Sequence, residues 1–254
     1  MTETSSEVWD AATAERYDED SVEMFAPEVL GPTVEFLTGL ADRGPVVEFA
    51  IGTGRVALPL HERGLEVRGI ELSAPMVERL RAKPGGREIE VTIGDMATAG
   101  VGEPGSAALV VLAWNSLSNL CTQDEQVACF ANAAAHLRPG GRFVVELWIP
   151  EIDRLAAGGR VALGTAALGE HIVLDEFDVA TQSCVSHHYW HDAGPDDGQV
   201  RYGTGRFRYA WPAELDLMAR LAGLAFEARY GGWDRAPFDH TSTNAVSVWR
   251  RPEG

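Results

Sequence analysis

The chain has 254 residues, 45% of them hydrophobic, and its 21 basic and 38 acidic side chains give a formal charge of −17. Since a domain usually holds about 100–200 residues, this length predicts one large domain, or one domain with a lid. So negative a charge argues strongly against a binder of duplex nucleic acid, which needs a basic surface, and it disfavours an anionic membrane surface.

The cysteines and the apolar runs narrow the class further. Cys121, Cys129 and Cys184 are odd in number and widely spaced, which indicates neither a disulfide framework nor a metal site. The longest apolar run, residues 107–114, is too short to span a bilayer. Residues 1–7 lack the basic and apolar regions of a signal peptide. We therefore expect a cytoplasmic protein with no metal ion and no membrane contact.

The first half of the chain has a regular rhythm. Residues 1–31 are polar and acidic, and we expect an N-terminal helical lid there. A short helix is predicted over 33–40, with Pro32 at its start. Strand-like segments then alternate with helix-like segments: the predicted strands are 46–50, 65–71, 88–93, 107–114 and 142–148, and the helices are 54–62, 74–82 and 122–137. This alternation predicts a doubly wound, Rossmann-like sheet of mostly parallel strands.

The rhythm changes after Pro150. Residues 169–177, 184–190 and 200–210 are rich in β-branched and aromatic side chains, and a turn cluster lies at 193–198. We therefore expect an inserted antiparallel β layer, a substrate-side subdomain, over 150–210. A helix at 212–222 and strands at 224–230 and 244–249 follow. Residues 32–149 and 211–254 together then form one seven-stranded cofactor-binding domain.

A glycine-rich turn at residues 48–57 carries the chemical information. On its own it fits two ligands, because Gly52, Gly54 and Ala57 match the dinucleotide pattern and Glu71 follows at the distance of a ribose ligand. Glu48 distinguishes between the two kinds of ligand. A carboxylate is poorly placed beside a pyrophosphate, whereas it favours a ligand that carries an ammonium and a sulfonium. S-adenosylmethionine is such a ligand.

This segment resembles the first motif of class I S-adenosylmethionine-dependent methyltransferases, acid-x-G-x-G-x-G, with Ala50 in place of the first glycine. The replacement is tolerable if residue 50 needs no positive φ. Further matches follow in the family's order: Glu71-Leu72-Ser73, Met76, Gly94-Asp95-Met96, the turn 137–141, and the closing antiparallel strand pair. The resemblance covers residues 46–149 and 212–250.

The resemblance implies roles for individual residues. Glu71 would bind the ribose hydroxyls, Met76 would pack on the adenine, and Asp95 would accept from the adenine amino group. The implied cofactor-binding residues are Tyr17, Glu48, Ala50, Gly52, Thr53, Gly54, Glu71, Leu72, Met76, Asp95, Met96, Trp114 and Asn115.

The acceptor is expected beside the segment 114–119, which follows the fourth strand and lacks the proline-rich motif of DNA amino-methyltransferases. Tyr17 on the lid is the candidate catalytic residue, although it and Trp9 could instead only hold the N-terminal segment to the core. His187 and His188 are adjacent on a predicted strand, so at most one faces a given pocket. The expected substrate-binding residues are Trp9, Asn115, Leu117, Trp148 and His188.

The whole chain resembles actinobacterial antibiotic-tailoring methyltransferases, those acting on amino sugars or lincosamide-type amines being the nearest. The resemblance implies N-methylation of a small-molecule amine by in-line transfer from S-adenosylmethionine. The main alternative is O-methylation of a small molecule. Protein methylation and a nicotinamide-dependent oxidation are less favoured alternatives. We expect a small-molecule acceptor, no nucleic acid, no membrane, and a possible homo-oligomer.

Overall fold

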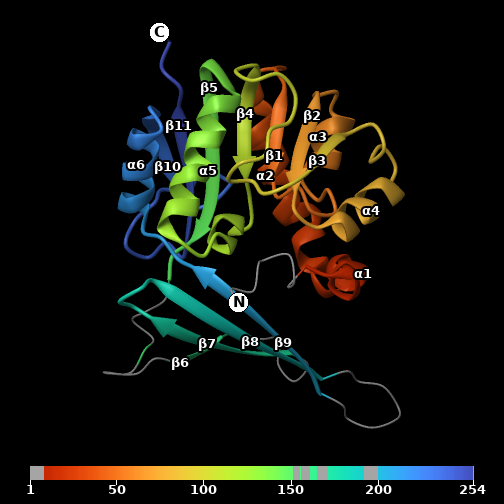
Figure 1. Ribbon diagram of the computed structural model, residues 1–254, viewed down its shortest axis with the longest axis vertical. Coiled ribbons are helices and arrows are strands. Elements are labelled where there is room, and N and C mark those ends of the chain that lie inside the picture. Colours follow the sequence, from red (N-terminus) through yellow and green to blue (C-terminus); the bar gives the residue numbers. More distant parts are fainter. Residues whose placement is uncertain (1–8, 151–154, 156–160, 165–170, 192–199, 254) are drawn as a thin grey trace.

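The structure is a computed structural model that describes residues 9–150, 155, 161–164, 171–191 and 200–253. It contains a seven-stranded sheet in the order β10-β11-β5-β4-β1-β2-β3 and a four-stranded sheet in the order β6-β7-β8-β9 (Figure 1). The strands of the first sheet are β1 Val46–Phe49, β2 Val67–Glu71, β3 Glu90–Ile93, β4 Ala107–Leu112, β5 Leu137–Trp148, β10 Ala225–Tyr230 and β11 Asn244–Arg250. Only β11 is antiparallel to its neighbours, β5 and β10.

Helices cover both faces of this sheet, as a doubly wound fold requires. The helices are α1 Ala11–Asp20, α2 Pro27–Ala41, α3 Ala57–Glu62, α4 Ala74–Ala82, α5 Gln123–His136 and α6 Pro212–Leu221, with short 3-10 helices η2 Val22–Phe25 and η3 Ser116–Asn119. The central strand β4 is buried throughout. Its Val110 and Leu112 pack with α5 and α6, and its Leu109 and Val111 pack with α2 and α3. The predicted seven-stranded, mostly parallel sheet is confirmed.

Two helices begin elsewhere than predicted. Helix α2 begins at Pro27, so Pro32 lies inside it rather than at its start. A proline in the first turn has no hydrogen bond to lose, which makes Pro27 the better starting point. Helix α3 begins at Ala57 rather than at residue 54, because Gly52 and Gly54 have positive φ and the backbone is not yet helical. In the described residues, no helix has the length and apolar character needed to cross a membrane.

The predicted antiparallel insert is present as β6 Val161–Gly164, β7 His171–Asp178, β8 Ser183–His191 and β9 Val200–Arg208. Strand β6 was not predicted, and the turn cluster 193–198 lies outside the described residues. The sheet lies below the carboxyl edge of the parallel sheet, and α1 closes the same side (Figure 1).

Arg208 anchors the small sheet to the large domain. Its side chain is buried, and it donates to Gln126 Oε1 of α5 and to Glu214 Oε1 of α6, each at 2.6 Å. Gln126 Nε2 returns a hydrogen bond to the Arg208 carbonyl at 3.1 Å. The end of β9 is thus held by charged and polar contacts that solvent screens little.

We predict that Arg208→Met lowers the free energy of unfolding by about 2 kcal/mol, because it leaves the half-buried Glu214 without its cation and Gln126 Oε1 without its donor. Adding Glu214→Leu should recover part of this loss, since no unpaired charge then remains. Urea denaturation measures both variants. The control is Arg206→Met on the exposed neighbouring position, where we expect a change of about 0.5 kcal/mol or less. Equal stability of the Arg206 and Arg208 variants would contradict the anchor.

Candidate active site

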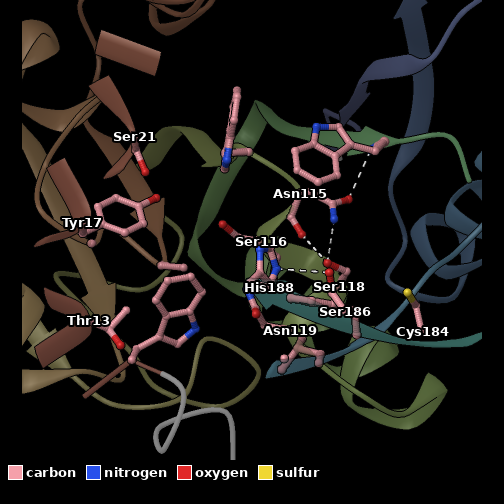
Figure 2. A pocket seen from close by; sticks show the side chains of 18 of the residues that line it. Thr13, Tyr17, Ser21, Asn115, Ser116, Ser118, Asn119, Cys184, Ser186 and His188 are labelled. Carbon is pink, nitrogen blue, oxygen red and sulfur yellow. Dashed lines mark hydrogen bonds between the residues drawn. The ribbon is translucent and has the colours of Figure 1, made fainter. Parts of the chain in front are cut away.

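A cavity of about 1060 Å³ lies between the carboxyl edge of the parallel sheet, α1 and the small sheet. Figure 2 shows Thr13, Tyr17 and Ser21 on one side of it and Asn115, Ser118, Ser186 and His188 toward the other. Ligands of open α/β sheets bind at this edge. The cavity is therefore the candidate active site.

The glycine turn after β1 is built around Glu71. Glu71 Oε2 accepts from the backbone N–H of Gly52 at 2.8 Å, and Oε1 accepts from that of Ser73 at 2.9 Å. Burial raises the pKa of Glu71, and these backbone donors oppose the rise. Each carboxylate oxygen can accept a second hydrogen bond. Glu71 is thus rigidly oriented and can still accept from two hydroxyl groups of a ligand.

Glu48 is buried at the end of β1, beside this turn. It accepts a backbone hydrogen bond from Ala57, but its Oε2 has no hydrogen-bond partner within the described part of the chain. Burial raises the pKa of Glu48 to about 8, and Arg55 opposes the rise. A buried carboxylate oxygen without a partner is unfavourable. A cationic group of a ligand at the turn would compensate it.

Helix α1 is fastened to the glycine turn. Asp18 accepts from Thr53 Oγ1 at 2.6 Å and pairs with Lys83 Nζ at 2.5 Å, and Lys83 also donates to the Thr53 carbonyl. Ser73 Oγ donates to the carbonyl of Trp9 at 2.6 Å. These contacts hold α1 against the carboxyl edge of the parallel sheet and place Tyr17 at the cavity. Burial raises the pKa of Tyr17, so its hydroxyl keeps its proton at neutral pH.

The chain leaves β4 through two consecutive left-handed residues, Trp114 and Asn115. Glu146 Oε2 accepts from the Trp114 backbone N–H at 2.7 Å, and Asn115 Oδ1 accepts from the Trp148 backbone N–H at 3.2 Å. Asn115 Nδ2 donates to Ser118 Oγ at 2.9 Å. Left-handed conformations of non-glycine residues cost free energy and concentrate at functional sites. Here they turn the Trp114 and Asn115 side chains to the cavity.

Most of the predicted site residues line this cavity. They are Trp9, Tyr17, Ala50, Gly52, Glu71, Leu72, Met76, Asp95, Met96, Trp114, Asn115, Trp148 and His188. Glu48 lies behind the turn rather than in the wall. His188 faces the cavity, whereas its neighbour His187 contacts Tyr202, as the alternation along a strand requires.

Four of the predicted residues have structural roles that the sequence did not indicate. Leu117 is fully buried in the core, because the 3-10 helix η3 turns it inward, and it does not line the cavity. Thr53 uses its hydroxyl for the lid contact with Asp18. Gly54 is needed for packing, since a Cβ there would collide with Leu80. Ala50 has φ +52°, so residue 50 does need a positive φ, and alanine replaces glycine there at a steric cost.

The sequence reasoning missed much of the wall that the small sheet provides. The additional lining residues there include His171, Asp175, Ser186, Trp190, Phe207 and Tyr209. Because alternate residues of a strand share a face, the position of His188 could have predicted that Ser186 and Trp190 lie on the same face. The residues of β7 depend on cross-strand register, in which Asp175 pairs with Ser186 and His171 with Trp190.

The residues present fit S-adenosylmethionine. Glu48 offers an uncompensated buried carboxylate, Glu71 offers acceptors for a ribose, and Met76 and Asp95 line the same cavity. The lining side chains among the described residues include six carboxylates, namely Asp10, Asp20, Glu71, Asp95, Glu146 and Asp175, and no lysine or arginine. Such a lining attracts cations and repels a pyrophosphate.

Comparison with known proteins agrees with this geometry. Residues 46–141 match the family model of a methyltransferase domain. The solved methyltransferase CcbJ from Streptomyces caelestis is 38% identical, with a TM-score of 0.83 over 94% of this chain and 96% of that one. A dTDP-3-amino-3,6-dideoxy-alpha-D-glucopyranose N,N-dimethyltransferase from Streptomyces fradiae is 30% identical over 74% of this chain and 72% of its own. A cypemycin N-terminal methyltransferase from Streptomyces sp. is 26% identical over 92% and 97%.

The chain belongs to the S-adenosylmethionine-dependent methyltransferases. It resembles in particular those of actinobacteria that tailor antibiotics and amino sugars, and its methyl donor is S-adenosylmethionine.

We predict that Ala50→Gly raises the free energy of unfolding by about 1 kcal/mol, because glycine adopts a positive φ without the steric cost that Ala50 bears. Chemical denaturation measures the change. The control is Ala131→Gly on the exposed face of α5, which removes the same methyl group from a helix and should cost about 1 kcal/mol. Destabilisation by both substitutions would contradict strain at residue 50.

Proposed function

We propose that this enzyme methylates the nitrogen of a small-molecule amine, in the biosynthesis of a natural product such as an antibiotic. The observation that carries the proposal is the lining of six carboxylates without a lysine or arginine among the described residues. An acidic lining concentrates cations, and amines are cations at neutral pH. The named acceptors of two relatives, an amino sugar and a peptide N-terminus, are also amines.

The cofactor supplies a methyl group on a sulfonium, which is already an activated electrophile. The residues therefore act mainly by positioning and by excluding water. Glu48 and Glu71 hold the cationic nucleoside, Met76 and Asp95 hold its base, and Ala50, Gly52, Leu72 and Met96 supply backbone and shape around it. We assign these roles from the positions of the side chains at the cavity edge, except for Glu48, whose role we assign from its buried carboxyl oxygen without a partner among the described residues.

The acceptor lies between Trp9, Tyr17, Asn115, Trp148 and His188, which border the cavity from the lid, the β4 turn, β5 and the small sheet. Tyr17 is the proposed catalytic residue. Its protonated hydroxyl can accept a hydrogen bond from the amine and so orient the nitrogen lone pair toward the methyl group. Aromatic rings on several sides suit an acceptor with an apolar body around its amine.

The location and the assembly of the enzyme are part of the proposal. The free thiols of Cys121, Cys129 and Cys184 suit a reducing compartment, and we therefore place the enzyme in the cytoplasm. Two further statements stay predictions, namely that the enzyme acts without nucleic acid and that it forms a homo-oligomer.

The function is tested with purified enzyme, labelled S-adenosylmethionine and four acceptors. These are a nucleotide-linked 3-amino sugar, a lincosamide-type cyclic amine, a short peptide with a free N-terminus, and a phenol. We expect methyl transfer to an amine and none to the phenol, with the methylated nitrogen located by mass spectrometry and NMR. Transfer to the phenol alone would establish the O-methyltransferase alternative, and transfer to the peptide alone would move the acceptor class to peptides.

The raised pKa of Glu48 gives a second prediction. In the free enzyme the carboxyl holds its proton at neutral pH, since its pKa is about 8. A bound sulfonium favours the ionised form. Cofactor binding therefore releases a proton below this pH, and the affinity rises as the pH increases toward it. Titration calorimetry in two buffers of different ionisation enthalpy measures the release.

Glu48→Gln should bind the cofactor more weakly and release no proton. The control is Glu35→Gln on the exposed face of α2, which should keep both the affinity and the proton release. A binding heat that does not depend on the buffer in the unmodified enzyme would show that Glu48 is already ionised or does not sense the cofactor.

A further inference from the structure

Four side chains of the small sheet form one line of hydrogen bonds along the cavity wall. Ser186 Oγ donates to Asp175 Oδ1 at 2.6 Å, Ser186 Oγ lies 3.1 Å from His188 Nε2, and His188 Nδ1 lies 2.9 Å from His171 Nε2. All four residues line the cavity, and Figure 2 shows Ser186 and His188 side by side there. The function described above uses none of these contacts.

The chemistry of the donors gives this line a single direction. The Asp175 carboxylate can only accept, so the Ser186 hydroxyl proton points to it. Ser186 Oγ must then accept from His188, which puts the proton of that ring on Nε2. His188 Nδ1 must in turn accept from His171 Nε2–H. His171 Nδ1 is left as an open acceptor, without a hydrogen-bond partner among the described residues.

Stacking fixes the rings that carry the line. The rings of His171 and Trp190 lie 4.9 Å apart with planes 9° from parallel, and Arg201 lies over Trp190 at 3.9 Å. Arg201 also pairs with Asp20 of α1 at 3.2 Å. The open end of the line is therefore oriented by a contact between the small sheet and the lid.

We propose that His171, His188, Ser186 and Asp175 are a proton relay that removes the proton of the acceptor's ammonium group before methyl transfer. This inference rests on the proposed amine acceptor. An ammonium has no lone pair and cannot attack a methyl group. The lid and the small sheet border the space proposed for the amine, and the relay gives its proton an acceptor in that wall.

Each transfer in the relay is balanced. The N–H bond of the ammonium breaks, its electron pair stays on nitrogen, and the proton binds His171 Nδ1. His171 Nε2–H passes its proton to His188 Nδ1, His188 Nε2–H passes its proton to Ser186 Oγ, and the Ser186 hydroxyl proton passes to Asp175. The half-buried Asp175 releases a proton to water, and the rings return to their first tautomer by exchange with solvent.

The charged groups around the relay suit this role. Burial lowers the pKa values of His171 and of His188, so both rings are neutral acceptors near pH 7. Asp20 raises the pKa of His171, and Arg201 lowers it. Asp175 raises the pKa of His188, and His187 lowers it. Neutral rings can take and pass a proton, which a permanently protonated ring cannot.

Nitrogen NMR of the imidazole rings tests the direction of the relay without any acceptor. In the unliganded enzyme, His171 and His188 should both carry their proton on Nε2 and none on Nδ1, with Ser186→Ala altering the His188 signals and leaving those of His187 unchanged. A proton on Nδ1 of His188 would overturn the proposed direction.

Kinetics test the transfer itself. Asp175→Asn keeps an acceptor for Ser186 but cannot take its proton, and Ser186→Ala cuts the line. With the amine that the unmodified enzyme methylates, each should lower kcat by about 10²-fold below the pKa of that amine. Above that pKa, where the amine arrives neutral, kcat should approach the unmodified value, and the cofactor Kd should be unchanged throughout.

The control is Glu176→Gln, the exposed neighbour of Asp175 that points to the other face of the same strand, and it should keep the full pH profile. A loss of equal size at every pH would show a structural role and overturn the relay, as would no loss at all. Failure of the unmodified enzyme to methylate any amine would instead refute the proposed function, and that result comes before any variant is made.

Discussion

The arrangement depends on two carboxylates, Glu48 and Glu71, that the fold buries at the same edge of the parallel sheet. Burial raises the pKa of both groups, and the charge of Glu71 raises the pKa of Glu48 further. Burial of acids close together is unfavourable unless donors or cations compensate them. The backbone of Gly52 and Ser73 compensates Glu71, but Glu48 Oε2 has no hydrogen-bond partner among the described residues, and Glu48 keeps its proton at neutral pH until a cation binds. The edge is thus prepared for a positive charge before any ligand arrives.

The same glycine turn organises the closure of the cavity. Thr53 lies in the turn and holds Asp18 of α1, so the lid rests on the loop that receives the cofactor. Asp20, at the end of α1, pairs with Arg201 of β9. Arg208, at the end of β9, returns to α5 and α6. Direct contacts therefore link the three walls of the cavity to one another. A displacement of α1 would be transmitted both to the glycine turn and to the small sheet.

Local signals in the sequence were sufficient to predict much of the fold and part of the site. The helix that follows Thr122 and the apolar strand β4 depend on neighbouring residues, and both lie close to their predicted ranges. Glu71 follows from its strand-end position. The inward turn of Leu117 depends on tertiary packing, which spacing does not encode. The line from Asp175 to His171 depends on the register between β7 and β8, and no single strand shows it.

The acidic lining that attracts an amine also opposes its reaction. A carboxylate-rich cavity stabilises the ammonium, which raises its pKa, while enclosure away from water lowers it. The nitrogen can attack the methyl group only in the neutral form, so stronger attraction of the acceptor means a smaller reactive fraction. An enzyme that uses charge to gather amines must therefore also provide an exit for one proton. Neutral histidines beside Asp175 meet that need, because they add no cation to the wall and still conduct a proton across it.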